Sequence, residues 1–298
     1  MKKYDVAGRT VVITGAAGGL GQMLADALRA RHANVALLDL DADAVTAQAE
    51  RLGGTRVARG WRVDVRDLGS LETAMREVEE HFGRIDVVIA GAGIGNVAGP
   101  LTATDPTAFE RVVDINLLGV WRTFRAAAPY VQERRGHLMA VASMASFVHA
   151  PLHGSYTSSK AGVWALCDSL RLEFRHLGVT VGSVHPSFFK TPLVDEALAQ
   201  KDAVRLFDNF EGAFQLIPPE NVVKDILLGI ERRSAQVVTP RTMRSAALAP
   251  GLIRLLVDRF GFSDTTIAGA IELSLQRIEE SPLRTAALQP HNEYSKSR

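Results

Sequence analysis

The 298-residue sequence contains a single cysteine, Cys167, and its charges almost cancel. One thiol cannot form a disulfide within the chain, so the composition is compatible with a reducing compartment, and we expect a cytoplasmic location. The 34 Lys and Arg residues against 33 Asp and Glu residues leave a formal net charge of +1. Because this balance offers no basic surface to a polyanion, we expect no nucleic-acid partner.

Long apolar runs are also absent from the sequence. No segment approaches the ~20 uninterrupted apolar residues that cross a bilayer. The nearest candidate, residues 245–262, contains Arg254, Asp258 and Arg259. The first five residues are largely polar, so the pattern predicts neither a secretory leader nor a transmembrane segment.

Metal-ligand spacing is a third absence. The sequence has no H-E-x-x-H and no C-x-x-C motif. His149 and His153 are separated by Pro151, which interrupts the one-turn helical spacing that a pair of ligands needs. We therefore expect no metal site.

What the sequence does contain is an alternation of short apolar runs with helical patterns up to about residue 240. The helical spacing is clearest over residues 20–31, 68–82 and 221–232. Several of the short runs are apolar throughout, which is typical of a parallel sheet covered on both faces. The expected strands are residues 10–14, 34–39, 56–63, 86–90, 137–142, 179–185 and 236–238. This order predicts an α/β fold with a doubly wound, Rossmann-like parallel sheet of about seven strands.

The composition changes near Pro240. Residues 242–288 show helical spacing without strand-like runs, and residues 289–298 are polar. We expect a Rossmann-fold domain over residues 1–240 and a helical C-terminal extension with a polar tail over residues 241–298, because so few helices bury little surface alone. The extension carries two apolar stripes that need a partner. This partner is the body of the subunit near the substrate loop, a neighbouring subunit or a membrane surface, and we favour packing on protein over a membrane. The stripes are Leu248, Leu252, Leu255, Leu256 and Phe260, and Ile267, Ile271, Leu275 and Ile278.

A glycine-rich turn follows the first expected strand. It runs from Thr14 to Gly21, with further glycines at 15, 18 and 19, and leads directly into a helix. Glycine lets the backbone approach a pyrophosphate, which the helix N-terminus then stabilises. The spacing is G-x-x-x-G-x-G, and alone it is a weak signal because a tight turn without a ligand has the same appearance.

Asp39 strengthens the nucleotide interpretation. It ends the second expected strand, 18 residues after Gly21, where a carboxylate accepts hydrogen bonds from an adenosine ribose and repels a 2′-phosphate. The glycine turn holds no cation and Leu40 follows the acid, so the pattern favours NAD over NADP. Alternatively, Asp39 caps the next helix, a role for which Asp41 competes. Asp64 ends the third strand, where it either contacts the adenine of the nucleotide or caps the next helix.

Tyr156 and Lys160 stand four residues apart at the start of a strongly helical segment, so they share one helix face. The unperturbed pKa of a phenol is about 10, and a neighbouring ammonium lowers that pKa toward neutrality. Such a tyrosine can exchange a proton with a substrate near neutral pH. Ser143, at the end of an expected strand, is placed to hydrogen-bond a substrate oxygen.

In this order, the glycine turn, Asp39, Ser143 and the Tyr156–Lys160 pair resemble the short-chain dehydrogenase/reductase family over roughly residues 7 to 240. Asn116, in the sequence N-L-L-G, resembles the family's fourth catalytic residue. The resemblance implies that Asn116, Ser143, Tyr156 and Lys160 are catalytic, with Asn116 holding a water in the proton relay.

Two stretches depart from the family pattern. Ala90 and Gly91 replace the first two residues of the N-N-A-G segment, which we expect to affect local stability more than chemistry. Pro186 to Thr191 resembles the P-G-x-x-x-T stretch that closes over nicotinamide, with Ser187 in the place of glycine. A positive φ at Ser187 would be strained.

The resemblance implies NAD as the cofactor, with contacts from the glycine turn, the strand ends and the nicotinamide side. The implied cofactor residues are Gly15, Gly19, Leu20, Gly21, Asp39, Asp64, Val65, Ala90, Gly91, Tyr156, Lys160, Pro186 and Thr191.

The implied activity is hydride transfer between NAD(H) and a secondary alcohol or ketone. The expected substrate contacts are Ser143, Met144, His149, Tyr156 and Phe188, within a wider lining that also takes in Ile94, Gly95, Phe147, Leu152, Phe189 and Leu193. This mostly apolar set predicts a hydrophobic small molecule that is steroid-, retinoid- or lipid-like. The alternative is a catalytically silent protein of the same fold that senses NAD(H) or carries a hydrophobic ligand.

Two long segments, residues 105–131 and 156–176, carry apolar side chains on nearly all sides. One face of each covers the sheet, and the remainder predicts burial against another subunit. Because the family often pairs these helices across a two-fold axis, we expect a homodimer or homotetramer.

Overall fold

A single parallel sheet organises the chain, of which the computed structural model describes residues 3–280. Its seven strands lie in the order β3-β2-β1-β4-β5-β6-β7, and every neighbouring pair is parallel. The strands are β1 (Thr10–Thr14), β2 (Asn34–Asp39), β3 (Ala58–Arg62), β4 (Val87–Ala90), β5 (His137–Val141), β6 (Thr180–Pro186) and β7 (Gln236–Thr239). The doubly wound fold predicted from the sequence is confirmed.

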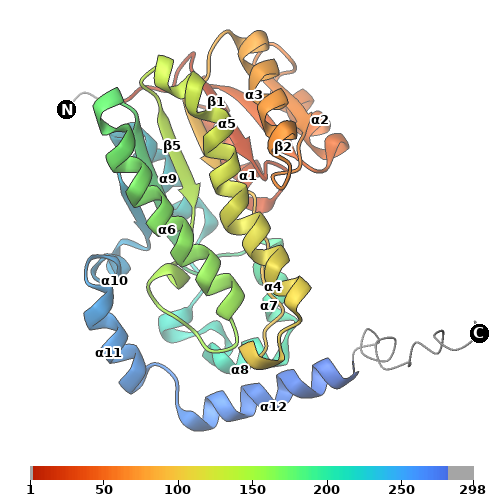
Figure 1. Cartoon of the computed structure of the whole chain (residues 1–298), viewed down its shortest axis with the longest axis vertical. Helices are drawn as coiled ribbons and strands as arrows, with labels where there is room; N and C mark the ends of the chain where they lie inside the picture. The colour runs from red at the N-terminus through yellow and green to blue at the C-terminus, as the bar shows by residue number, and fades with distance from the viewer. Residues whose placement is uncertain (1–2, 281–298) are drawn as a thin grey trace, which may run out of the picture.

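Helices cover both faces of this sheet (Figure 1). The core on one face is closed by α1 (Gly19–Arg29), α2 (Ala42–Arg51) and α9 (Pro219–Arg232). On the other face the core is closed by α3 (Leu68–Phe82), α5 (Gly119–Glu133) and α6 (Gly154–Phe174). The strands between them are apolar on both sides because both of their faces are buried. The short helices α4 (Pro106–Val113), α7 (Pro192–Leu198) and α8 (Lys201–Leu206) lie beyond the carboxyl ends of the strands.

The caps of α2 and α3 show which of the acidic residues after β2 and β3 serve as helix caps. The carboxylate of Asp41 accepts a hydrogen bond from the Ala44 amide at 2.9 Å and caps α2. Asp67 accepts from the Gly69 amide at 2.9 Å and caps α3. Neither Asp39 nor Asp64 is therefore the cap of the following helix, and both remain at the carboxyl edge of the sheet.

The strand order reverses direction at β1, which lies between β2 and β4. In sheets of this kind, loops leave in opposite directions on the two sides of that point and open a crevice at the carboxyl ends of the strands. The glycine turn after β1 and the loop after β4 meet at this position. The fold thus places the ligand site before any side chain is considered.

The C-terminal extension consists of helices over the residues that the structure describes, 241–280. They are α10 (Arg244–Leu248), α11 (Pro250–Phe260) and α12 (Asp264–Glu280), with α12 running beside α8 along the bottom of Figure 1. The expected polar tail lies outside the described residues. Leu252, Leu255 and Leu256 of the first stripe are more than half exposed, so residues 3–280 do not cover that stripe. The division into a domain and an extension at residue 240 stays a prediction.

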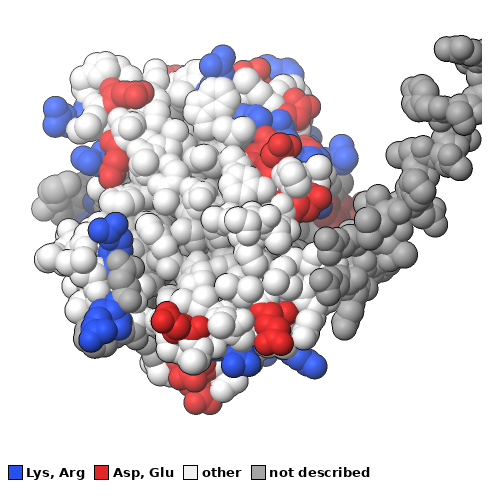
Figure 2. Space-filling model, turned by 60° about the horizontal axis from the view of Figure 1, so that its bottom comes forward, with Lys and Arg blue, Asp and Glu red and all other residues white. Residues whose placement is uncertain are grey.

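The face that carries the bottom of Figure 1 has few charges in its middle. Figure 2 shows Lys, Arg, Asp and Glu side chains gathered around the margin of this face. Elsewhere, Trp121 on α5 and Leu172 on α6 are 40% and 57% exposed, on the helices for which we predict contact between subunits. The oligomer itself remains a prediction. Within residues 3–280, no helix is long and apolar enough to cross a membrane.

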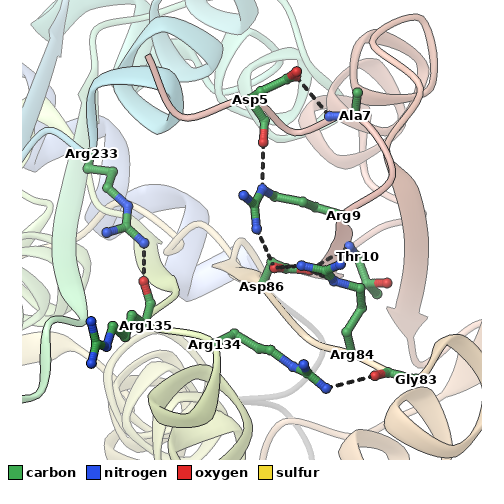
Figure 3. Close-up of polar contacts among 10 residues, drawn as sticks. All are labelled: Asp5, Ala7, Arg9, Thr10, Gly83, Arg84, Asp86, Arg134, Arg135 and Arg233. Carbon is green, nitrogen blue, oxygen red and sulfur yellow. Dashed lines mark hydrogen bonds and ion pairs between the residues drawn. The ribbon is translucent and has the colours of Figure 1, made fainter. Parts of the chain in front are cut away.

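A buried ion cluster fastens the opposite, amino-terminal end of the sheet (Figure 3). Asp86 is fully buried and accepts hydrogen bonds from the Thr10 amide, from Arg9 at 2.9 Å and from Arg84 at 2.6 and 2.7 Å. Burial would raise the pKa of Asp86, but these hydrogen bonds outweigh it and lower that pKa. The cluster joins the starts of β1 and β4 on the side of the sheet away from the crevice.

Candidate active site

A cavity of about 790 Å³ occupies the crevice at the carboxyl ends of the strands. At one end it is lined by the glycine turn, Asp39 and Asp64, and in the middle by Ser143, Tyr156 and Lys160. Its other end is walled by aromatic residues. Every residue that the sequence predicted as a cofactor contact lines this cavity except Ala90, whose side chain is buried in β4.

The glycine turn leaves no room for side chains where a ligand backbone would lie. Gly15 has φ +73°, and a Cβ at this position would lie 2.7 Å from the backbone of Ala92. A Cβ on Gly21 would lie 2.2 Å from the Gly15 carbonyl oxygen. Gly18 precedes α1 and offers the helix no side-chain cap, so the first amides of α1 are available to an anion.

The departure at Ala90 and Gly91 is compensated by Thr14. The Thr14 hydroxyl accepts hydrogen bonds from the amides of Gly91 and Ala92 at 3.2 and 3.4 Å. A Cβ on Gly91 would lie 2.9 Å from the Thr14 carbonyl oxygen, so the two loops approach more closely than a side chain allows. A tie between β1 and β4 therefore persists without the asparagines. Ser187 has no positive φ, so its expected strain does not arise.

Two carboxylates stand at the end of the cavity beside the glycine turn. Asp39 accepts a hydrogen bond from the Ala17 amide at 3.0 Å, and from the Asp41 amide at 3.3 Å, which fixes its position in the wall. Asp64 is paired with Arg66 at 2.6 Å, and hydrogen bonds from Arg66 lower the pKa of this carboxyl. Arg66 also lines the cavity, a cation that the sequence reasoning missed because it looked only at the glycine turn and at the residue after Asp39.

Tyr156, Ser143 and Lys160 converge in the middle of the cavity. The Ser143 side chain neighbours the Tyr156 hydroxyl, and the Lys160 ammonium lies 5.7 Å from the centre of the tyrosine ring. Lys160 donates to the Val141 carbonyl at 2.8 Å, and a Cβ on Gly93 would lie 3.4 Å from its Nζ. The first turn of α6 thus presents the phenol and the ammonium to the same space.

The pKa values in this group follow burial. Burial raises the pKa of Tyr156, and the hydrogen bond from Ser143 only partly offsets it. The predicted lowering of the tyrosine pKa by Lys160 is wrong for the protein without cofactor, because burial has the larger effect on that pKa. Burial also lowers the pKa of Lys160 to about 8.

Asn116 joins two segments that border the cavity, and its catalytic role stays a prediction. It lies in a π-helical turn, residues 114–118, between α4 and α5, and is fully buried. Its side-chain oxygen accepts from the Ile94 amide at 2.8 Å, and its amide donates to the Ile94 carbonyl at 2.9 Å and to Ser159 at 3.3 Å. The side chain therefore clamps the loop after β4 to α6. Asn116 lies outside the lining of the cavity.

His185 contacts the backbone of Ser143, a role that the sequence did not reveal. Its Nδ1 lies 3.1 Å from the Ser143 carbonyl oxygen, and its Nε2 lies 2.8 Å from the Ser183 hydroxyl. Burial lowers the pKa of His185 to about 4, so the imidazole is neutral near pH 7. The ring also packs on Phe147 at 4.4 Å, which removes Phe147 from the expected lining.

The end of the cavity away from Asp39 is aromatic. Phe188 packs on Phe207 at 4.8 Å, Phe207 on Phe214 at 5.3 Å, and Phe214 stacks on Phe262 of the extension at 5.8 Å. All four line the cavity, as does Met243 from the start of the extension. Sequence reasoning found only Phe188, although three phenylalanines within residues 207–214 were a visible signal.

The predicted substrate contacts divide into two groups. Ser143, Met144, Tyr156 and Phe188 line the cavity, together with Ile94, Gly95 and Phe189 of the wider prediction. His149 is exposed and lies outside the lining, because the loop turns at Pro151 and brings His153 to the cavity instead. Leu152 is buried in the hydrophobic cluster that also contains Phe207 and does not line the cavity, and the Leu193 side chain lies outside what the structure describes.

Metal ligands do not gather around this cavity. Within residues 3–280, no group of three His, Cys, Asp or Glu side chains is arranged to hold a metal ion. Cys167 is buried in α6, where burial raises the pKa of its thiol to about 12.

Comparison with known proteins places the chain in a family. A family model described as short chain dehydrogenase matches residues 9–202. A 2-dehydro-3-deoxy-L-rhamnonate dehydrogenase (NAD(+)) from Sphingomonas sp. (strain SKA58) is 33% identical over 64% of this chain and 76% of its own length. Dehydrogenase/reductase SDR family member 7B from Bos taurus is 30% identical over 87% of this chain and 83% of its own length. The chain belongs to the short-chain dehydrogenase/reductase family of oxidoreductases.

Solved structures of the family share the fold. A short-chain dehydrogenase/reductase from Burkholderia phymatum, solved in complex with NAD, superposes with a TM-score of 0.74 at 22% identity, covering 85% of this chain and 96% of that one. A short-chain type dehydrogenase/reductase from Mycobacterium marinum superposes with a TM-score of 0.69 at 26% identity, covering 78% of this chain and 94% of that one. The family model ends at residue 202, before the extension begins.

Proposed function

We propose that this protein transfers a hydride between NAD(H) and a secondary alcohol or ketone that carries a bulky apolar group. One observation carries the proposal: Tyr156, with Ser143 beside it and the Lys160 ammonium 5.7 Å from its ring, lies in the cavity between a glycine turn and an aromatic wall. A phenol, a hydroxyl donor and a cation at one point form a proton-transfer site.

The cofactor proposal rests on the fit of the Asp39 end of the cavity. Gly15 and Gly21 permit the tight turn that leads into α1, and α1 offers its first amides to a pyrophosphate. Asp39 presents a fixed carboxylate to an adenosine ribose, which favours NAD over NADP. Arg66 does not reverse this preference, since its charge is already paired with Asp64. The name of the Sphingomonas relative also states NAD(+).

When bound, the nicotinamide supplies the hydride or accepts it. The residues of the chain handle the proton. Because burial raises the pKa of Tyr156, the phenol is protonated near neutral pH and is able to donate to a carbonyl oxygen, which favours reduction. Lys160 is charged at that pH, with a pKa of about 8, and stabilises the phenolate that remains. Ser143 holds the substrate oxygen, and His185 holds Ser143.

The apolar substrate proposal rests on the far wall. Phe188, Phe207, Phe214 and Phe262 form a continuous aromatic surface, and His153 beside them has its pKa lowered by burial. A wall of this composition favours a large apolar molecule with one polar oxygen near Tyr156. A steroid-, retinoid- or lipid-like alcohol or ketone has that shape.

The test compares Tyr156→Phe with Tyr130→Phe, a matched change on α5 away from the cavity. Turnover is measured on a panel of secondary alcohols with NAD+ and ketones with NADH, and NADH binding is followed by fluorescence. We expect Tyr156→Phe to lose at least roughly 100-fold in kcat while it still binds NADH, because only the exchangeable proton is removed. NADH binding without turnover on any compound, in the wild type and both variants, would instead favour the silent binding protein.

A further inference from the structure

Helix α12 of the extension is fitted closely to α8, a short helix beside the aromatic wall (Figure 1). Ala270 and Ser274 are fully buried in α12, although the helix lies at the edge of the molecule. A Cβ on Gly269 would lie 2.3 Å from the guanidinium carbon of Arg205, so the Arg205 side chain crosses α12 at this glycine. The two helices therefore form one packed unit.

Arg277 makes the polar contacts of this unit. Its Nη1 donates to the Gln200 side-chain oxygen at 2.8 Å and to the carboxylate of Asp202 at 3.0 Å. Its Nη2 lies 2.9 Å from the second carboxylate oxygen of Asp202, and also donates to the carbonyl of Ala98. One guanidinium thus joins α12 to α8 and to the loop that follows β4.

The residues that Arg277 joins belong to two segments that border the cavity. Gln200 lines the cavity at the start of α8, and Asn96 lines it two residues before Ala98. The Ala98 amide also donates a longer hydrogen bond directly to the Gln200 side-chain oxygen, at 3.4 Å. The contacts of Arg277 and this bond together hold the loop around Ala98 beside the start of α8.

The burial of the Asp202 carboxylate makes its ion pair with Arg277 necessary. Its side chain is 2% exposed, and a buried carboxylate is strongly unfavourable without a charged partner. A guanidinium is planar with five donors, so it can satisfy a carboxylate, an amide oxygen and a carbonyl at once. The single ammonium of a lysine lacks that fork, and cannot hold the three acceptors in the same positions.

We propose that Arg277 is a positioning residue that fixes the width of the aromatic end of the cavity, and with it the preference for bulky apolar substrates. It acts by holding α8 and the loop around Ala98 against α12. This inference rests on the proposed function for its kinetic consequence, while its structural consequence can be measured in the absence of any turnover.

The first experiment is hydrogen exchange on the full chain. We compare the wild type with Arg277→Met and Arg277→Lys, and with Arg254→Met as a control that removes an exposed arginine from α11. In Arg277→Met we expect amides of residues 94–100 and 200–206 to exchange at least tenfold faster, with the strands unchanged. In Arg277→Lys we expect partial recovery, and in Arg254→Met no change. Unchanged exchange in both segments of Arg277→Met would overturn the proposal, whatever the activity.

The second experiment measures steady-state kinetics on a small and a bulky ketone with NADH. In Arg277→Met we expect KM for the bulky ketone to rise about tenfold, while KM for NADH and for the small ketone, and kcat, stay within about threefold. A uniform fall in kcat with all KM values unchanged would show a merely structural role and overturn the specificity claim. An inactive wild type would refute the proposed function, and the exchange data would still decide whether Arg277 holds α8 and the loop around Ala98 in place.

Loss of its partner leaves Asp202 as a buried charge, so Arg277→Met alone can fail to fold. The double variant Asp202→Leu with Arg277→Met removes both charges and restores an apolar contact. We expect this protein to fold and to keep α8 on α12, while the loop around Ala98 still loses protection. Protection of that loop equal to the wild type would overturn the role given to Arg277.

Discussion

Acidification from pH 7 to pH 5 is expected to destabilise this protein through two buried histidines on neighbouring strands. His137 of β5 and His185 of β6 are both fully buried. Burial lowers the pKa of His137 to about 3, helped by the charge of Arg233, and burial lowers the pKa of His185 to about 4. Both imidazoles are therefore neutral in the folded protein throughout this range, whereas in the unfolded chain they take up protons below pH 6.5.

The magnitude follows from the linkage between protonation and folding. A histidine with a depressed folded pKa contributes its full stability above the unfolded pKa, and loses it as pH falls toward the folded pKa. For each pH unit below 6.5, one such histidine lowers the free energy of unfolding by about 1.4 kcal/mol. At pH 5 each histidine has therefore lowered it by about 2 kcal/mol. The pair loses about 4 kcal/mol, a large part of the roughly 5–15 kcal/mol that holds a typical domain folded. Carboxylates add little in this window, since their unfolded pKa values are near 4.

Urea unfolding at pH 7 and pH 5 measures this loss. His137→Gln keeps a polar group beside Thr180, whose hydroxyl lies 2.8 Å from Nδ1 of His137, and cannot be protonated. We expect the loss of unfolding free energy between the two pH values to be about 2 kcal/mol smaller in this variant than in the wild type. His149→Gln, a change at an exposed histidine, is the control and should leave the loss unchanged. An equal loss in His137→Gln and the wild type would refute the reasoning.

Three further predictions concern the cavity. Asp39→Ala should reduce the ratio of kcat/KM with NAD+ to kcat/KM with NADP+ by at least roughly tenfold, because it removes a charge that repels a 2′-phosphate. Steady-state kinetics with both cofactors measure this ratio, and an unchanged ratio would contradict the prediction. Gly21→Ala should lower stability by about 3 kcal/mol and abolish NADH binding, because its Cβ would meet the Gly15 carbonyl, whereas Gly251→Ala in open space should do neither in melting and titration experiments. Lys160→Met should weaken NADH binding and slow turnover together, and a loss of turnover alone would contradict its double role.

The sheet and the Asp39 end of the cavity could be predicted from sequence because both depend on local patterns. Runs of apolar residues report burial on both faces of a strand, and each expected strand appears within two residues of its predicted limits. Glycine spacing reports where two backbones approach, and the approach of the turn at Gly15 to Ala92 is the kind of contact it signals. The cap at Asp41 was among the alternatives that the sequence offered, whereas the cap at Asp67 was not predicted.

The aromatic end could not be predicted because it depends on packing between distant segments. Phe262 reaches Phe214 only because α12 is held against α8, and no spacing within the sequence records that contact. The predicted lowering of the Tyr156 pKa was wrong for the same reason. Spacing along the helix reports the neighbouring ammonium, but it does not report how deeply the phenol is buried. The contacts of the Asn116 side chain with Ile94 could not be predicted either, because only the fold brings the two residues together, and the catalytic role of Asn116 stays a prediction.

The strand order has a consequence for synthesis on the ribosome, where the amino-terminal part of a chain emerges first. Strands β3, β2, β1 and β4 are neighbours in the sheet, and all four are complete by residue 90. This half-sheet contains the glycine turn and Asp39, whereas the aromatic wall awaits Phe262, and Arg277 emerges later still. A nascent chain thus gains the place for the nucleotide early and the place for the other reactant last, so any ribosomal product that stops before α12 would hold one without the other.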